Sequence, residues 1–312
     1  MGFQRTRFLL LFLFLLFALR TGDERGTALM DLISVDTLKH HVRSIHFDRN
    51  PSAHAGEMEV AARYIYQELQ KAELTVWKEP FQWEGRWFHN VVAEKRGCAS
   101  PDRVLILGAH YDTVPGSPGA DDNASAVAVL LEVAKQVQGT TLSSTVRFIA
   151  FALEEYGYVG SIHHARKAQH EGERISGMIS LEMVGFTGPR QQYPPYINPK
   201  HYPHVGDFIG IVANEKSKGL LEEVRRAFRT HIAQLPAEFM VVPGNGEGLE
   251  EVRLSDHSPF WDQGYPALMV TDTAFLRNPN YHLPTDTMET LDFEFMQKVA
   301  VGIYYSVVEL AK

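Results

Sequence analysis

One short stretch of the sequence concentrates side chains that can bind metals. Residues 107–125 read LGAHYDTVPGSPGADDNAS, and His110, Asp112, Asp121 and Asp122 lie there, directly after the apolar run RVLIL. Ionised carboxylates repel one another, and removing them from water is costly unless a counter-charge is present. The stretch is therefore either fully solvated or built around a cation.

Three further places along the chain put metal-binding side chains near the end of an apolar run or in a loop. Glu154 and Glu155 follow RFIAFAL, Glu182 follows GMISL, and His282 lies in NPNYHLPTDT. Each of these residues alone is weak evidence for a metal site. If they follow neighbouring strands, however, they would all lie at one edge of a sheet. Oxygen and imidazole ligands without a thiolate suit zinc, although manganese or cobalt could occupy the same ligands.

The elements that must position these side chains indicate an α/β fold. Residues 35–72 have apolar residues at helical spacing, which predicts two helices, and residues 74–97 alternate as a hairpin does. Short apolar strands then alternate with amphipathic helices. We expect a single three-layer domain over residues 29–312, with a mixed, mostly parallel β-sheet and helices on both faces. The Pro- and Tyr-rich segment 186–206 is expected to be a surface loop near the mouth of the site.

The first 22 residues read as a targeting segment. A basic start at Arg5 and Arg7 precedes an apolar run over residues 8–19, which is too short to span a bilayer comfortably. A signal peptide is the first interpretation, and it predicts an exported protein, periplasmic or secreted. Because Arg20 interrupts the expected cleavage pattern, an uncleaved membrane tether through residues 8–19 is the alternative.

Composition excludes some classes of partner and site. The net charge is −8, the isoelectric point is about 6.0, and lysines and arginines are not clustered, so we expect no nucleic-acid partner. Cys98 is the single cysteine, so no cysteine-based zinc or redox site is expected. These features leave the oligomeric state open.

Five motifs together resemble one enzyme family. GAHYDTVPGSPGADDNASAVAVLLE, ALEEYGYVGS, SLEMVG, SDHSPF and TDTAFLRNPNYHLPTDT occur in this order between roughly residues 100 and 292. They resemble metallopeptidase family M28, the co-catalytic zinc aminopeptidases. The resemblance implies a zinc-dependent exopeptidase that removes N-terminal residues from peptides with a free amino terminus.

The same resemblance implies a role for each candidate residue. The ligands are His110 and Glu182 for one zinc ion, Glu155 and His282 for the other, and Asp122 as the bridge between the two. Glu154 is implied as the general base that takes a proton from the attacking water, and Asp112 as the residue that orients the His110 imidazole. Glu182 stands where the commonest family pattern has Asp. Asp121 is expected to be structural.

A charge count also favours two metal ions without appeal to the family. Two Zn²⁺ ions bring four positive charges, and Asp122, Glu155, Glu182 and a bridging hydroxide bring four negative ones. With a single zinc ion held by Asp122, Glu155 and His282, Glu182 would be a poorly compensated carboxylate.

Other polar residues receive ordinary interpretations. His163 and His164 are expected to face solvent on at least one side and to bind no metal, while His257 is expected beside the site or in its pocket. Asp286 and Glu289 have the spacing of a capping box for the last helix.

Two other functions stay open. A glutaminyl cyclase of similar fold would use one zinc ion for intramolecular acyl transfer, but the retained HYD and ADDN sequences argue against it. A non-catalytic binding ectodomain of the same fold would be expected to lose metal ligands, and this chain keeps them all.

Overall fold

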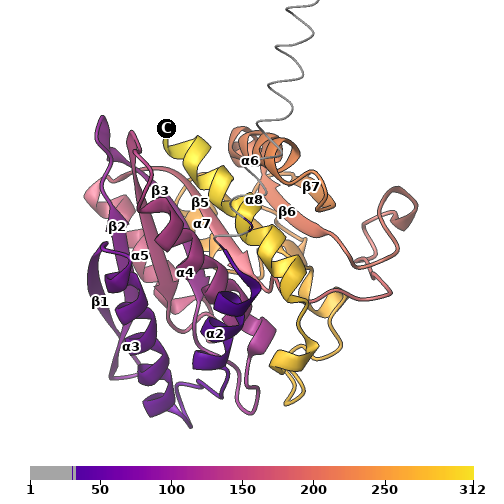
Figure 1. The fold of residues 1–312 in the computed structure, drawn as a ribbon, viewed down its shortest axis with the longest axis horizontal. Helices are drawn as coiled ribbons and strands as arrows, with labels where there is room; N and C mark the ends of the chain where they lie inside the picture. Colours follow the sequence, from indigo (N-terminus) through magenta and orange to yellow (C-terminus); the bar gives the residue numbers. More distant parts are fainter. Residues whose placement is uncertain (1–29, 31–32) are drawn as a thin grey trace, which may run out of the picture.

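The computed structural model describes Met30 and residues 33–312 (Figure 1). The predicted leader over residues 1–22, with its possible tether at 8–19, lies outside the described residues. Within the part of the chain that is described, no helix is both long and apolar enough to cross a membrane.

Eight strands form one mixed sheet. They are β1 (Thr75–Trp83), β2 (Arg86–Lys95), β3 (Ser100–His110), β4 (Ser144–Phe151), β5 (Arg174–Glu182), β6 (Ile209–Asn214), β7 (Ala237–Val242) and β8 (Ala267–Thr271). Their order in space is β1-β2-β4-β3-β5-β8-β6-β7. The four central strands β4, β3, β5 and β8 are parallel, as are β6 and β7, while β1–β2, β2–β4 and β8–β6 pair antiparallel.

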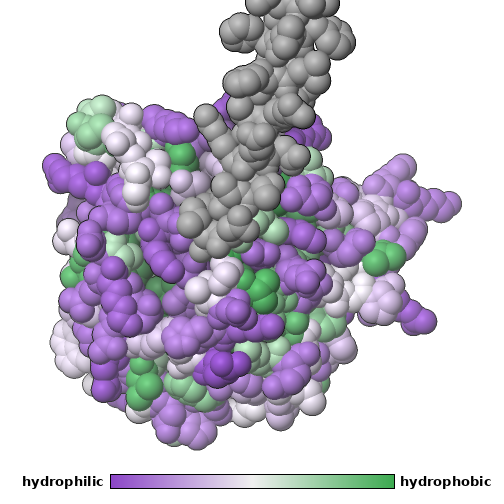
Figure 2. Space-filling model, in the orientation of Figure 1, coloured by the Kyte–Doolittle hydropathy of each residue, from purple (hydrophilic) through white to green (hydrophobic). Residues whose placement is uncertain are grey.

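Helices cover both faces of this sheet, which confirms the predicted three-layer α/β fold. They are α2 (Val35–Ile45), α3 (Ala55–Lys71), α4 (Ala126–Val137), α5 (Val159–Glu171), α6 (Lys218–His231), α7 (His257–Asp262) and α8 (Phe293–Ala311). On one face α8 packs against both α4 and α6, and on the other α5 packs against α7 (Figure 1). The surface seen in Figure 2 is mostly hydrophilic with scattered apolar residues, as expected for a face in contact with water.

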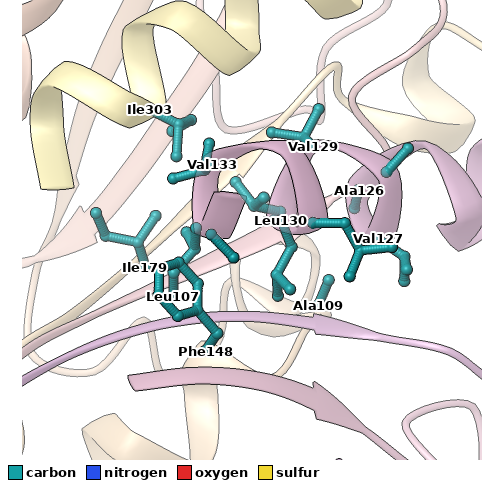
Figure 3. Packing of buried hydrophobic residues seen from close by; sticks show 14 of the residues in the cluster. Leu107, Ala109, Ala126, Val127, Val129, Leu130, Val133, Phe148, Ile179 and Ile303 are labelled. Carbon is teal, nitrogen blue, oxygen red and sulfur yellow. The ribbon is translucent and has the colours of Figure 1, made fainter. Parts of the chain in front are cut away.

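The packing of α4 on the sheet fixes the loop that precedes it. Leu130 of α4 points toward Leu107 of β3 and Phe148 of β4, and all three side chains are fully buried (Figure 3). Burying one such side chain stabilises the fold by about 1.5–3 kcal/mol. Because α4 begins directly after the turn at Ala120–Ser125, this contact also holds that turn against the sheet.

The beginning of the chain follows the sequence prediction closely. The two expected helices are α2 and α3, and the expected hairpin is β1–β2. Its turn residues Glu84 and Gly85 both have positive φ, 48° and 75°, which suits a tight two-residue hairpin turn.

A buried arginine connects three segments next to the site. The side chain of Arg49 is fully buried, and burial lowers its pKa to about 10, a value at which it still carries its charge at neutral pH. Its guanidinium donates hydrogen bonds to the carbonyl oxygens of Ile45, Phe47, Tyr111, Pro118 and Gly119. The end of α2, the segment after β3 and the loop before Asp122 are therefore held by one side chain.

Replacing this arginine is expected to destabilise the whole domain. Arg49→Met leaves buried carbonyl groups without a donor, and each such group costs about 1–3 kcal/mol, so we expect a loss of at least about 3 kcal/mol in urea unfolding. Arg43→Met, at an exposed position of α2, is the control and should change stability by no more than about 0.5 kcal/mol. Equal unfolding midpoints for the two variants would contradict this role of Arg49.

Candidate metal centre

The predicted metal-binding side chains meet at the carboxyl ends of neighbouring strands. His110 is the last residue of β3 and Glu182 the last residue of β5, while Glu154 and Glu155 follow the end of β4. Because β3 lies between β4 and β5 and runs parallel to both, the three strand ends are adjacent.

Asp122 faces two different histidines with its two carboxylate oxygens. Its Oδ1 lies 3.2 Å from Nε2 of His110, and its Oδ2 lies 3.1 Å from Nε2 of His282. Each histidine also has a glutamate of its own: Glu182 Oε2 is 3.5 Å from His110 Nε2, and Glu155 Oε2 is 3.2 Å from His282 Nε2. The five side chains therefore form two sets of three that share Asp122.

Several atoms of these two sets are buried without a hydrogen-bond partner among the described residues. They are Nδ1 and Nε2 of His110, Oδ1 of Asp122, Oε1 of Glu155 and Nε2 of His282. Buried polar atoms are almost always paired in proteins, so an orphaned cluster of this kind needs an explanation. Imidazole nitrogens and carboxylate oxygens converging on one another are the donor set of a zinc site, and the residues fit such an ion.

The electrostatics of the cluster also favour a site that binds a cation. Burial raises the pKa of Glu154 well above its ordinary value, and the neighbouring Glu182 and Glu155 add to this effect while His110 opposes it. Burial and the charge of Asp122 raise the pKa of Glu155 to about 7. Carboxylates this close do not all ionise easily unless positive charge lies among them.

Asp112, two residues after the end of β3, is hydrogen-bonded to the segment that follows β4. It accepts hydrogen bonds from the backbone N–H groups of Glu154 (3.0 Å) and Glu155 (3.3 Å). Its Oδ1 also lies 3.6 Å from Nδ1 of His110, which is too long for a hydrogen bond. Asp112 therefore sets the position of the glutamate pair through their backbone, while its role in orienting the His110 imidazole stays a prediction.

The backbone is strained at three places that present ligands. Leu153, directly before the glutamate pair, has φ 63°, Met183, directly after Glu182, has φ 47°, and His282 itself has φ 60°. A left-handed conformation costs a residue with a side chain on the order of 1–2 kcal/mol. Such strain collects where function requires a particular side-chain direction.

Asp286 supports Asp122 and does not cap the last helix, so the capping prediction was wrong. Asp286 is buried and accepts hydrogen bonds from the backbone N–H groups of Asp121 (2.9 Å) and Asp122 (3.1 Å). The cap of α8 is Asp292, whose side chain accepts from the N–H of Phe295. The position of Asp292 directly before the apolar helix run was the signal that could have found it.

Asp121 points away from the metal cluster and is structural, as predicted. Its carboxylate accepts hydrogen bonds from the N–H of Gly185 (2.9 Å) and from Nδ2 of Asn278 (2.8 Å). It therefore links the loop before α4 to the end of β5 and to the segment that carries His282.

The SDHSPF motif reaches the site through residues other than the expected histidine. Ser255 donates to Oε2 of Glu182 at 2.8 Å, and Asp256 is fully buried with its pKa raised by burial to about 7. His257 instead pairs through Nε2 with the carbonyl oxygen of Val252 at 2.9 Å. Sequence reasoning missed Ser255 and Asp256, although both stand beside the residue it selected.

His164 also differs from its predicted place. Its side chain is buried, with Nδ1 2.8 Å from Glu79 and Nε2 3.3 Å from Arg147, so neither side faces solvent. These two partners satisfy the imidazole and explain why a histidine is tolerated in the interior. As expected, it is not part of the metal cluster.

Comparison with known proteins agrees with the fold. An uncharacterized protein of Escherichia coli, YfbL, is 33% identical over 259 residues, which cover 78% of this chain and 77% of that protein. The solved LapA aminopeptidase of Legionella pneumophila has a TM-score of 0.72 at 20% identity and covers 92% of this chain and 75% of its own. A glutaminyl cyclase of Porphyromonas gingivalis has a TM-score of 0.68 at 20% identity, covering 88% and 97%.

A solved zinc aminopeptidase of Bacillus subtilis is 25% identical, with a TM-score of 0.58 over 74% of this chain and 52% of that one. The chain spans about half the length of the curated leucine aminopeptidases that it matches. The family description "Peptidase family M28" matches residues 90–307, a range that contains every predicted ligand. With its ligands gathered at the strand ends and this match over most of its length, the chain belongs to peptidase family M28.

Proposed function

We propose that the protein is an aminopeptidase that uses two zinc ions to remove N-terminal residues from peptides with a free amino terminus. The observation that carries this proposal is Asp122, whose two oxygens face His110 and His282 separately. A carboxylate placed in this way could bind one cation with each of its two oxygens. The zinc in the name of the Bacillus subtilis relative supports the choice of metal.

In this proposal each ion has one histidine and one glutamate of its own. His110 and Glu182 hold one ion, His282 and Glu155 hold the other, and Asp122 is shared. The glutamate in place of the commoner aspartate at position 182 is fixed by Ser255, which donates to its Oε2 at 2.8 Å. This hydrogen bond restricts the longer Glu182 side chain to one rotamer.

Zinc in such a site supplies Lewis-acid polarisation of the scissile carbonyl and lowers the pKa of the attacking water. In this proposal Glu154 moves the proton. Its Oε2 is 3.9 Å from Nε2 of His110, farther than the oxygens of Asp122 and Glu182, while its backbone N–H is fixed by Asp112. A carboxylate that stays off the metals can take a proton from the water and pass it to the leaving amine.

Metal analysis tests the ion count directly. We expect two zinc ions per chain in the purified protein, because the two sets of ligands would otherwise leave buried carboxylates uncompensated. Atomic absorption of the protein after dialysis, together with activity during zinc titration, measures this. A single tightly bound zinc ion, with no activity gained on further addition, would instead support the one-zinc cyclase.

The two adjacent glutamates should respond differently to the same substitution. Glu154→Gln should lower kcat by roughly two to four orders of magnitude, the loss expected for a positioned general base, with zinc content and KM nearly unchanged. Glu155→Gln should weaken one zinc ion, because an amide replaces an anionic ligand, and excess zinc should partly restore its rate. If Glu154→Gln loses zinc while Glu155→Gln keeps both ions, the two roles are reversed.

Blocking the substrate's amino terminus should abolish cleavage. The free amine is the substrate group that the carboxylates and metals of this site can hold, and N-acetylation removes both its charge and its basicity. Matched aminoacyl-anilides with free and acetylated amines, assayed at the same zinc concentration, check this expectation. Equal rates on the two substrates would contradict exopeptidase action.

A further inference from the structure

A pocket opens directly beside the metal centre. Glu182 and Tyr281 both line it, and the ring of Tyr281 stacks on that of His282 with 3.7 Å between centroids. A substrate with its scissile bond at the metal-binding side chains therefore has this pocket within reach of its first side chain.

The floor of the pocket is one face of the sheet at β8, β6 and β7. Gly210 of β6 lies opposite Glu238 of β7 and opposite Thr271 of β8, and Val212 lies opposite Met240 in the next pair on the same face. A Cβ atom at position 210 would lie 3.3 Å from the carbonyl oxygen of Thr271 and 3.5 Å from the side chain of Thr273, so there is little room for a side chain on the strand at this point.

The walls of the pocket are aromatic. Tyr193, Tyr196 and Tyr202 come from the loop expected near the site mouth, and Phe208 and Phe275 complete the lining. Aromatic faces of this kind pack well against methylene groups and attract cations.

Besides Glu182 at the metal centre, two carboxylates, Glu238 and Glu251, stand in this largely apolar lining, and no lysine, arginine or histidine is among the described residues that line it. Burial raises the pKa of Glu238 above its ordinary value, and no ion pair of Glu238 is found within the described part of the chain. The second carboxylate, Glu251, accepts a hydrogen bond from the hydroxyl of Tyr196 at 2.9 Å.

Arg277 does not line the pocket but contacts two residues that do, Phe208 and Gln191, and its Nη2 has no hydrogen-bond partner among the described residues. Its guanidinium lies 4.5 Å from the centre of the Phe208 ring, and its Nε donates to Gln191 at 2.9 Å. Arg277 is mostly buried, and Asp272 and Asp121 are the carboxylates that most support its charge.

This lining discriminates between kinds of substrate side chain. An apolar side chain would remove water from Glu238 and offer nothing in return, which is costly for an ionised carboxylate. A lysine or arginine side chain would instead lay its methylene groups along the aromatic walls and place its charge at the carboxylate.

We propose that this pocket receives the side chain of the substrate's first residue and selects arginine or lysine through Glu238. The inference rests on the proposed aminopeptidase function, because it places the first residue of a peptide at the metal centre. Glu251 at the same pocket gives the positive charge a second carboxylate.

The first test measures selectivity in hydrolysis. Anilides of arginine, lysine, citrulline and leucine are assayed with the zinc-loaded protein, citrulline being the uncharged analogue of arginine. We expect kcat/KM for arginine and lysine to exceed that for citrulline by at least about tenfold. Glu238→Gln should reduce the arginine and lysine values by about ten- to a hundredfold, and it should not lower the leucine value, because the carboxylate that an apolar side chain would desolvate is gone.

Glu250→Gln is the matched control, since it makes the same charge change at an exposed position next to the pocket but outside its lining. It should keep the arginine-to-leucine ratio of the unmodified protein. An unchanged ratio in Glu238→Gln would overturn the assignment of the pocket, while continued hydrolysis of leucine anilide would leave the proposed function standing.

A binding measurement separates the two proposals if no anilide is cleaved. Isothermal titration of L-arginine and L-citrulline into the zinc-loaded protein reports on the pocket without turnover. Tighter binding of arginine that disappears in Glu238→Gln supports the pocket even when the aminopeptidase proposal fails. Equal affinities of the unmodified protein for L-arginine and L-citrulline would overturn the proposal that this pocket selects arginine or lysine.

Discussion

The accumulation of buried negative charge at the ends of β3, β4 and β5 is the constraint on which the rest of the structure depends. Asp122, Glu154 and Glu182 are each more than nine-tenths buried, and burial alone disfavours the charged form of each. Hydrophobic packing cannot remove this cost, because it arises from the loss of water around an ion. Cations bound among the side chains would remove this cost, and the surrounding backbone holds the side chains in positions where they could bind such cations.

This arrangement depends on polar residues that do not themselves face the metals. Asp112 holds the glutamate pair through backbone N–H groups, Asp286 does the same for the bridging aspartate, and Arg49 fixes the loop between the two. Each connects segments that are distant in sequence. Ligands on loops are thereby held nearly as firmly as ligands on strands, which is the condition for a site that keeps its geometry.

The sequence was sufficient to predict the three-layer fold, its hairpin and the set of side chains at the strand ends. These features follow from local patterns: β4 is buried along its whole length and its second half, residues 148–151, is apolar, while His110 and Glu182 are placed by the strands that end with them. Hydrophobic periodicity and the ends of apolar strands can be recognised from the amino-acid sequence alone.

The supporting contacts were not predictable in the same way. Asp286 and Asp292 both precede the last helix. The place of Asp292 directly before the helix marks the cap, but only the tertiary fold shows that Asp286 supports Asp122. His164 and Asp256 are polar residues whose burial depends on partners from other elements. Long-range pairing leaves no signature in a single sequence.

The central place of α8 has a consequence for how the molecule is made. This helix packs against both α4 and α6, although it is the last element along the chain, and His282 lies just before it. During synthesis a nascent chain can form the hairpin and the β3–β4 pairing early. One layer of its core and one histidine of its metal centre are complete only after residues 282–311 have left the ribosome. Until then the apolar sides of α4 and α6 lack their shared neighbour, a state in which partly made chains are prone to aggregate.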